Sequence, residues 1–442
     1  MKIKKKFDQY FSEDYLKDIY SEVVVFSRAT GIDNLDQPSF WPQLNDHVEI
    51  LSRKAKSGTY RFTKYKLKLI SKGRGKAPRE ISIPTIRDRI ALRAMCDFLS
   101  EIYDGAVKFS LPQHVVNEVK SEIFSGKYDA CVKLDVTNFY PSIKHDEMMS
   151  RLGKKIRNNN IKSLILSALQ SPTVSASRIG DPPNDRGVPQ GLAISNILAS
   201  LYLMNVDKFF GSRTDIKYYR YVDDILILCS YSDADDISSQ VIKRFSRIGL
   251  KIYDPVKNPD KSSIGRLSSG FSYLGYQFSG GKVTVRSASV DKLKESLVSI
   301  FTSYKYSKGR SEDFLLWRLN LRITGCVFEN KSKGWLFFFL EINDESLLHS
   351  LDSYVEKLTK RFGVSVKPKK FVRAYKELSH NKYGTKYVPN FDKYTLDQMK
   401  EVLVDYFNMD LSKKENEEII YEFKRRLTKQ VKDLQVDIMN FS

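Results

Sequence analysis

Residues 217–230, with the sequence KYYRYVDDILILCS, decide the fold of this chain. Two runs rich in Tyr, Val, Ile and Leu, residue types that suit a pleated sheet, flank the adjacent aspartates Asp223 and Asp224. A break of two residues between such runs predicts a tight hairpin with the aspartates at or next to its tip. Residues 225–229 are apolar throughout, which predicts a strand buried on both faces.

Two neighbouring carboxylates at the mouth of a buried hairpin repel each other, so a cation is needed to offset their charge. Mg²⁺ fits this position because it binds a few carboxylates and completes its coordination with water and substrate phosphates. The alternative is a solvated Asp-Asp turn without function. For an isolated pair of aspartates that alternative is favoured, and the remaining sequence decides against it.

The composition describes a soluble globular chain with a polyanionic partner. The 442 residues carry a net charge of +20, which indicates nucleic acid before a membrane surface. We expect a cytoplasmic protein, because no apolar run is long enough for a transmembrane helix and the basic start lacks a signal-peptide core. The four cysteines form no metal-binding spacing and are expected to be reduced thiols.

A third carboxylate follows another predicted strand. Residues 130–135 form a short apolar run that ends in Asp135. A strand-end aspartate beside a hairpin pair can hold two metal ions, which clamp the attacking and leaving oxygens of an in-line displacement. Tyr140 lies five residues further on, where an aromatic ring could lie against the sugar of a nucleotide; the alternative is an ordinary core tyrosine.

Two glycine-containing segments complete the candidate site. Residues 60–70 alternate as a strand, and a basic loop then leads into a second short strand, so residues 60–84 predict a hairpin with cations near its tip. Among these cations, Lys76 and Arg79 could hold a triphosphate; the alternative is a solvated basic turn. Residues 186–196 predict a turn that opens a helix to about residue 210, with Gln190 pointing into the cleft.

The second half of the chain is expected to be mostly helical. Residues 271–278 predict one strand with a glycine in its middle, and helices are expected from about residue 287. One stretch combines cations with aromatic residues and no acidic residue, a composition typical of a nucleic-acid backbone groove, with a solvated charged face as the alternative. Its candidate contacts are Lys357, Lys360, Arg361, Lys367, Lys369, Lys370 and Arg373.

Taken in order, these segments resemble a reverse transcriptase. The resemblance covers about residues 60–285 and rests on Arg79 with Ile-Pro-Thr-Ile-Arg-Asp-Arg, Leu-Asp135-Val-Thr-Asn-Phe-Tyr140, Gly-Val-Pro-Gln190-Gly, Tyr-Val-Asp223-Asp224, Gly-Leu with Asn258 and Lys261, and Tyr273-Leu-Gly-Tyr. Each motif alone is weak, whereas six in this order are specific. The sequences of these motifs are most similar to those of bacterial enzymes, namely group II intron, retron and defence-associated reverse transcriptases.

The resemblance implies a role for each matching position. Asp135, Asp223 and Asp224 would be the catalytic carboxylates that hold two Mg²⁺ ions, with Mn²⁺ as a substitute and the carbonyl of Val136 as a further ligand. Tyr140 would be the steric gate that rejects a 2′-hydroxyl, and Gln190 would contact the incoming dNTP. Lys76 and Arg79 would hold its triphosphate, although Lys76 is one residue out of the commoner spacing. Lys261 would approach the leaving phosphate, and Tyr273, Leu274 and Gly275 would belong to the primer grip.

The implied fold is an α+β right-hand polymerase with an antiparallel palm sheet and a helical thumb. We expect an N-terminal helical extension over residues 1–59, fingers over 60–129, a palm with interleaved finger segments over 130–285, and a thumb region over 286–442. The expected activity is synthesis of cDNA on an RNA template. The tail from residue 310, with its Leu319-to-Gly325 and Lys333-to-Phe339 stretches, resembles stand-alone antiphage-defence enzymes that copy a cognate non-coding RNA.

Three other functions remain open at this stage. An RNA-dependent RNA polymerase shares the palm carboxylates but typically has Gly-Asp-Asp at the hairpin and no bulky residue at the position of Tyr140. A template-independent or protein-primed DNA polymerase would use the same site. An RNA-binding maturation factor would make the polymerase site incidental, which the joint presence of Asp135, Asp223, Asp224 and Gln190 disfavours.

Overall fold

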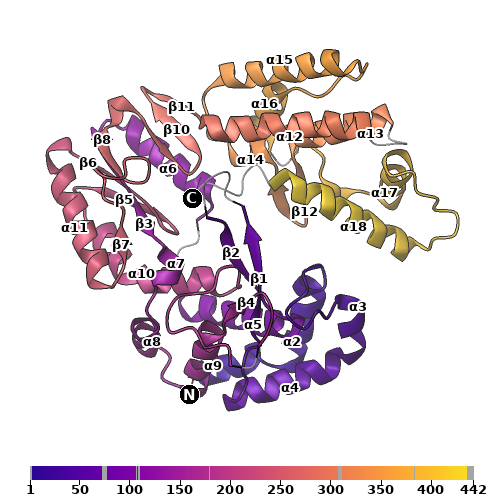
Figure 1. Ribbon diagram of the computed structural model, residues 1–442. Coiled ribbons are helices and arrows are strands. Elements are labelled where there is room, and N and C mark those ends of the chain that lie inside the picture. Colours follow the sequence, from indigo (N-terminus) through magenta and orange to yellow (C-terminus); the bar gives the residue numbers. More distant parts are fainter. Residues whose placement is uncertain are drawn as a thin grey trace. The chain divides into compact units, whose positions relative to one another are not determined.

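The computed structural model describes residues 2–71, 77–105, 107, 110–178, 180–306, 311–382 and 384–435. The chain folds into two compact units (Figure 1). Unit 1 contains residues 1–109 and 130–265, and unit 2 contains residues 110–129 and 266–442. The finer division into fingers, palm and thumb at the bounds given above stays a prediction.

Unit 1 has one continuous apolar core shared by helices and two sheets. Its helices are α1 (Lys2–Tyr10), α2 (Glu13–Ile19), α3 (Gln37–Phe40), α4 (Leu44–Ser57), α5 (Ile86–Ile102), α7 (Phe139–Ser142), α8 (His145–Gly153), α9 (Asn159–Gln170), α10 (Ser195–Gly211) and α11 (Ala234–Arg247). Its strands are β1 (Tyr65–Ile70), β2 (Arg79–Ile83), β3 (Ala130–Thr137), β4 (Thr173–Val174), β5 (Lys217–Tyr221), β6 (Asp224–Cys229), β7 (Lys251–Ile252) and β8 (Ser263–Arg266), which ends at the boundary.

The larger sheet of unit 1 has the order β5-β6-β3-β7, with β8 also paired to β3. The pairs β5–β6, β6–β3 and β3–β7 are antiparallel. Strand β6 is buried along its whole length, as its apolar sequence predicts. Strand β3 continues two residues past Asp135 to Thr137, so the prediction that it ends at Asp135 is wrong. Because β3 lies between β6 and β7, Asp135 is in a central strand of the sheet.

The predicted basic hairpin forms, but its first strand is shorter than expected. Strands β1 and β2 are antiparallel with Ile70 opposite Arg79, and β4 pairs in parallel with β1. Residues 60–64 are not a strand, and backbone N–H groups there donate to side chains: Thr63 N–H to the buried Asp88 carboxylate at 3.0 Å and Phe62 N–H to Ser167 Oγ at 3.3 Å. Lys76 lies outside the described residues.

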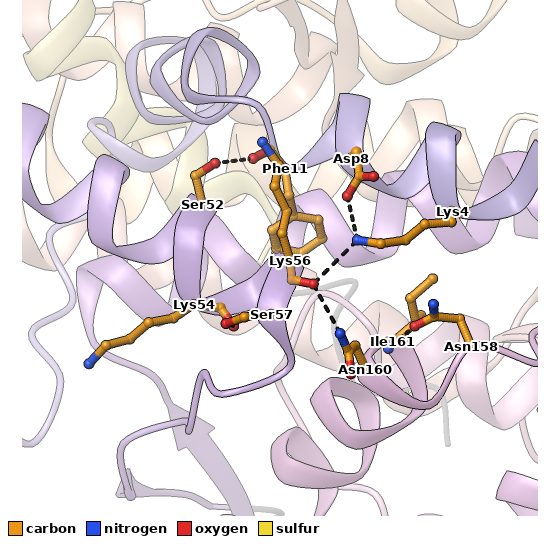
Figure 2. Close-up of polar contacts among 10 residues, drawn as sticks. All are labelled: Lys4, Asp8, Phe11, Ser52, Lys54, Lys56, Ser57, Asn158, Asn160 and Ile161. Atoms are coloured by element: carbon orange, nitrogen blue, oxygen red, sulfur yellow. Dashed lines mark hydrogen bonds and ion pairs between the residues drawn. The ribbon is translucent and has the colours of Figure 1, made fainter. Parts of the chain in front are cut away.

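The N-terminal helices are fixed to α9 by polar contacts at one junction (Figure 2). The backbone carbonyl of Lys56, at the end of α4, accepts from Lys4 Nζ at 3.3 Å and from Asn160 Nδ2 at 3.2 Å. The buried Ser52 hydroxyl donates to the Phe11 carbonyl at 2.6 Å. Residues far apart in the sequence therefore share one rigid corner of unit 1.

Unit 2 contains α6 (Pro112–Phe124), β9 (Phe271–Tyr273), β10 (Tyr276–Ser279), β11 (Lys282–Val285), α12 (Ser287–Tyr306), α13 (Glu312–Thr324), β12 (Cys326–Phe328), β13 (Lys331–Lys333), α14 (Trp335–Phe338), α15 (Glu345–Phe362), α16 (Phe371–Asn381), α17 (Leu396–Glu401) and α18 (Asn416–Gln435). The mostly helical C-terminal region is thus confirmed. None of the helices described in either unit has the length and apolar composition needed to cross a membrane.

The expectation of one strand over residues 271–278 is wrong. Residues 271–279 form the hairpin β9–β10, in which Tyr273 faces Tyr276 across a turn of two residues. Leu274 and Gly275 have φ values of +48° and +83°, as a two-residue turn with both central residues in the left-handed region requires. A glycine in the middle of an apolar run marked this turn rather than a flat strand.

Asp344 links β11 to α15 and gives a prediction on stability. It caps α15 at Leu347 N–H and accepts from Thr284 Oγ1 at 2.6 Å and Lys282 Nζ at 3.0 Å. Burial alone would raise the pKa of Asp344, but these hydrogen bonds, with one from Ser346, lower it to about 2.

We expect Asp344→Asn to lower the free energy of unfolding by about 2 kcal/mol at pH 7. Because the folded pKa lies below the unfolded one, this contribution is present above about pH 4 and is lost as the pH falls toward 2. Urea unfolding of Asp344→Asn and of the exposed control Asp291→Asn checks it. A difference between the two variants that stays constant from pH 7 to pH 3 would contradict the assignment.

Candidate active site

The predicted hairpin is present, and its turn is strained. Strands β5 and β6 pair with Tyr221 opposite Asp224, so Val222 and Asp223 form the turn. Val222 has a φ of +57°, in the left-handed region that a β-branched residue rarely adopts. Such strain costs about 1–3 kcal/mol and persists only where surrounding contacts hold it.

The register between β3 and β6 brings Asp135 to the hairpin. Asp135 of β3 lies directly opposite Asp224 of β6. The two residues are only 9% and 8% exposed, whereas Asp223 is partly exposed at the turn. Asp135 precedes Asp223 by 88 positions and Asp224 by 89 positions. The fold nevertheless brings the three carboxylates together at one end of the sheet.

Burial and the neighbouring charges raise the pKa values of Asp223 and Asp224. Burial, followed by the charges of Asp223 and Asp135, raises the pKa of Asp224 to about 7. Burial and the charge of Asp135 also raise the pKa of Asp223, while Arg79 and Lys261 act in the opposite direction. A site that holds three carboxylates against this repulsion stabilises the binding of a cation.

The donor set fits a hard divalent cation. Its side-chain ligands are carboxylate oxygens, which Mg²⁺ and Mn²⁺ accept, and Val136 follows Asp135 directly in β3. Among the described residues, no three Asp, Glu, His or Cys side chains are already arranged around a common metal position. The assignment of the metal ligands therefore rests on donor chemistry and stays a prediction.

Lys261 contacts the site as a counter-charge. Its Nζ donates to Asp135 Oδ2 at 3.0 Å. Partial burial lowers the pKa of Lys261, but the hydrogen bond and charge of Asp135 raise it overall, so this side chain stays charged. The backbone of Asp135 is also fixed, because its N–H donates to the buried Ser262 Oγ at 3.1 Å and its carbonyl accepts from Tyr253 N–H at 3.0 Å.

Tyr140 lies beside the carboxylates with its hydroxyl anchored. The hydroxyl donates to Asn196 Oδ1, at the start of α10, at 2.6 Å. Burial, followed by the charge of Asp223, raises the pKa of Tyr140, which keeps its hydroxyl protonated as a donor. The ring packs at 5.4 Å from that of Phe139. Tyr140 is thus a half-buried residue at the site and not an interior core residue.

The loop over residues 186–196 lies between α7 and β2. Val188 N–H donates to the Tyr140 carbonyl at 2.9 Å, and Ser82 N–H donates to the Gln190 carbonyl at 2.7 Å. Gly191 requires a glycine, because it has a φ of +97° and a Cβ there would lie 2.8 Å from Ile81. Arg79, at the start of β2, acts electrostatically on both Asp223 and Tyr140. Unit 1 thus brings together the segments that carry Arg79, Tyr140 and Gln190.

The other predicted site residues belong to unit 2. Tyr273, Leu274 and Gly275 form the end of β9 and the β9–β10 turn. Of the predicted backbone-contacting cations, Lys357, Lys360, Arg361 and Lys367 are exposed. Lys369 is partly buried and donates to the Tyr387 carbonyl at 2.5 Å, Lys370 pairs with Glu356 at 3.5 Å, and Arg373 pairs with Glu377 at 3.8 Å.

The predicted interleaving of aromatics with these cations is not borne out as a groove lining. Phe371 is fully buried, and Phe362 stacks on Phe301 at a ring distance of 5.2 Å. The Tyr375 hydroxyl donates to the Ile342 carbonyl at 2.5 Å. These rings follow the apolar faces of α15 and α16, so the mixture of cations and aromatics that suggested a nucleic-acid backbone groove reflects the packing of two amphipathic helices.

A supporting pair behind the hairpin was missed by sequence reasoning. Arg220 Nη1 donates to the strained Val222 carbonyl at 2.7 Å, and its Nε donates to Asp207 Oδ1 of α10 at 2.7 Å. The Tyr218 hydroxyl also donates to Asp207, at 2.9 Å. The only signal was the single arginine within an aromatic strand, and nothing in the sequence pointed to Asp207.

We expect Arg220→Ala to lower the free energy of unfolding by roughly 2–4 kcal/mol. The substitution removes the ion pair of the partly buried Asp207 and the hydrogen bond to the Val222 carbonyl. The matched control is Arg213→Ala, which breaks an ion pair with the exposed Asp215 and should cost about 1 kcal/mol or less. Urea unfolding compares the two. Equal losses of unfolding free energy in the two variants would show that the Arg220–Asp207 pair contributes no more to stability than an ordinary surface ion pair.

Comparison with known families finds a match over the segments that form this site. A family model described as "Reverse transcriptase (RNA-dependent DNA polymerase)" matches residues 70–278, a range that contains the hairpin, Asp135, Tyr140 and Gln190. The chain carries a reverse transcriptase domain. The assignment, together with the antiparallel sheet that holds the carboxylates, confirms the predicted α+β right-hand polymerase fold and its RNA-directed DNA polymerase class.

Several proteins are similar to the reverse transcriptase domain and its surroundings. "Protein YkfC" of Escherichia coli is 21% identical over 297 residues, which cover 57% of this chain and 76% of YkfC. The group II intron-encoded protein LtrA of Lactococcus lactis is 24% identical over 172 residues, and the chain spans only 28% of its length. A solved telomerase structure from Candida albicans aligns with 89% of this chain and with 67% of the telomerase chain. The aligned parts are 15% identical and have a TM-score of 0.42.

Proposed function

We propose that this protein copies an RNA template into DNA with two Mg²⁺ ions, for which Mn²⁺ can substitute. The observation that carries the proposal is the register that sets Asp135 opposite Asp224, beside Asp223 at the turn. When bound at these carboxylates and the Val136 carbonyl, the ions would neutralise the charge that develops on the oxygens of an in-line displacement. In that displacement the primer 3′-hydroxyl attacks the α-phosphate of a dNTP and pyrophosphate leaves.

The surrounding residues mainly position the substrate and balance its charge. Arg79 would bind the triphosphate, for which its planar guanidinium is suited. Tyr140 would lie against the sugar and exclude a 2′-hydroxyl, and Gln190 would contact the nucleotide from the loop before α10. Lys261, paired with Asp135 in the free protein, would donate to the leaving phosphate.

We further propose a cognate structured RNA as the template, a cytoplasmic location and a role in bacterial antiphage defence. Support for an RNA partner comes from the net charge of +20. Support for the defence role comes from the resemblance of residues 319–339 to stand-alone defence enzymes. The dNTPs, the RNA and the cDNA product would be its ligands.

Purification from the native host tests the proposal. RNA and DNA that co-purify with the protein are sequenced, in parallel with a variant that carries Asp223→Ala and Asp224→Ala. One abundant structured RNA, with complementary DNA in the wild type alone, is the expected result. DNA unrelated to any bound RNA would favour a template-independent polymerase, and heterogeneous RNA without DNA would favour an RNA-binding maturation factor; either overturns the proposal.

A further inference from the structure

Two stretches of unit 1 are basic and lack acidic residues. Residues 50–79 contain eleven Lys and Arg and no Asp or Glu, and residues 148–180 contain six Lys and Arg and no Asp or Glu. In a chain with 53 acidic residues, two such stretches stand out. The polymerase chemistry uses only Arg79 and Lys76 from the first stretch and none from the second.

The fold packs these two stretches against each other in unit 1. Asn160 Nδ2 donates to the Lys56 carbonyl at 3.2 Å, which joins the end of α4 to the start of α9 (Figure 2). Gly58 has a φ of +77°, and a Cβ there would lie 2.8 Å from the Asn160 side chain, so the approach of the two segments is close. Further along, Tyr65 N–H donates to the Pro172 carbonyl at 2.9 Å, and β1 pairs with β4.

We define the α4–α9 face as residues 50–64 and 154–172. Six of its cations are exposed, and two of these, Arg61 and Lys155, donate to backbone carbonyls. The other four have no ion pair or side-chain hydrogen bond within the described part of the chain: Arg53, Lys54, Lys154 and Arg157. The acidic residue Asp181 reaches the face, where it pairs with Lys64 at 2.9 Å. These four cations therefore remain available to an external anion.

The face also has a polar hollow of about 330 Å³. Charged and hydrogen-bonding side chains line much of it: Arg61, Lys64, Ser163, Ser167, Gln170 and Ser171. Arg, Lys, Ser and Gln are side chains that commonly contact nucleic-acid phosphates and sugars. Both the hollow and the exposed cations are therefore suited to contact the phosphates and sugars of a nucleic acid.

The face does not have the composition of a protein interface. No large exposed hydrophobic side chain occurs among its described residues, whereas the centre of a protein–protein interface is apolar and depleted in charge. In Figure 1, α4 and α9 lie at the lower end of unit 1, and the strands β3 and β6 that carry the carboxylates lie at the upper left. A ligand on this face would therefore not occupy the polymerase site.

We propose that the α4–α9 face binds the phosphate backbone of a structured RNA outside the polymerase site. It would hold a folded part of the RNA while another part enters the active site as template. The inference rests on the RNA partner proposed above but not on polymerase activity. Because cations that neutralise phosphates release counterions, this binding must weaken steeply with salt.

The test measures binding of bulk tRNA as a function of salt. One variant carries Arg53→Gln, Lys54→Gln, Lys154→Gln and Arg157→Gln. The matched control carries Lys208→Gln, Lys243→Gln, Arg247→Gln and Lys251→Gln, four exposed cations of α10, α11 and β7 that give the same change of net charge. Thermal unfolding checks that both variants are folded.

We expect the face variant to bind tRNA at least about tenfold more weakly at 0.1 M salt, and the slope of log affinity against log salt to shrink by roughly 3. The control should stay near the wild type, and extension of a saturating short primer–template should be equal in all three proteins. Equal losses in both variants would reduce the effect to net charge and overturn the inference, as would an unchanged face variant. Failure of the wild type to make DNA would overturn the proposed function and leave the binding result valid.

Discussion

The double variant Asp223→Ala and Asp224→Ala should make DNA at least about a thousandfold more slowly than the wild type, while its fold stays intact. Charge stabilisation by bound metal is worth several kcal/mol, and each 1.36 kcal/mol is tenfold in rate. Asp224 lies opposite Asp135, so its loss removes the shared ligand position and not a peripheral contact. Primer extension with Mg²⁺ measures the effect.

The control is Asp235→Ala and Asp236→Ala, an adjacent pair exposed on α11. It removes the same charge and should retain nearly full activity. A double variant at Asp223 and Asp224 that still polymerises would show that these residues are not the catalytic carboxylates. A control that loses activity equally would point to a general effect of charge.

The same site predicts how metal-free stability depends on pH. Burial and its two neighbours raise the pKa of Asp224 to about 7, above its ordinary value of 3.8. A carboxyl group that binds its proton more tightly in the folded state makes the protein less stable as the pH rises through this interval. Without divalent cations, Asp224→Asn should therefore gain stability over the wild type between pH 4 and pH 8, as urea unfolding would measure.

The second large effect concerns the sugar. Tyr140→Ala should reduce the preference for dNTPs over rNTPs by about 10- to 200-fold, the range that one small steric difference in a pocket can supply. The ring lies near Asp223, and its hydroxyl is held by Asn196 at 2.6 Å, so the side chain is fixed at the site. Steady-state incorporation of matched dNTP and rNTP pairs measures the ratio.

Tyr140→Phe separates the ring from its anchor. It keeps the steric bulk and loses the hydrogen bond to Asn196, so most of the discrimination should remain. If Tyr140→Ala gains no use of ribonucleotides, the assignment of Tyr140 as steric gate fails. Loss of discrimination in both variants would instead assign the selectivity to the hydroxyl and its partner.

The sequence predicted the elements around the carboxylates because local pattern and site chemistry coincide there. The apolar run after Asp224 predicts a buried strand, and the break before it predicts a turn, which the structure has one residue earlier, at Val222 and Asp223. The register between β3 and β6 could not be derived from either strand alone, since it depends on pairing between distant segments. The family resemblance supplied what local pattern could not.

The errors have the opposite cause, because long-range contacts replaced a local preference. Residues 60–64 alternate like a strand, yet the N–H groups of Phe62 and Thr63 donate to the side chains of Ser167 and Asp88 and not to a neighbouring strand. Residues 271–278 predict one strand because both halves are strand-like, whereas Leu274 and Gly275, with positive φ values, form a turn. Asp207 supports the active-site hairpin from a helix, a role that only tertiary structure reveals.

The path of the chain has a consequence for its synthesis. Residues 110–129 interrupt unit 1, and their helix α6 belongs with later segments of the chain. The Asp129 backbone carbonyl accepts from Leu267 N–H at 2.9 Å, and Lys120 Nζ donates to the Glu341 carbonyl at 3.1 Å. A ribosome therefore releases α6 long before residues 266–341 exist to cover it. Any fragment that stops after β7 keeps the catalytic carboxylates but leaves α6 without its partners, so expression of the isolated catalytic half should favour aggregation.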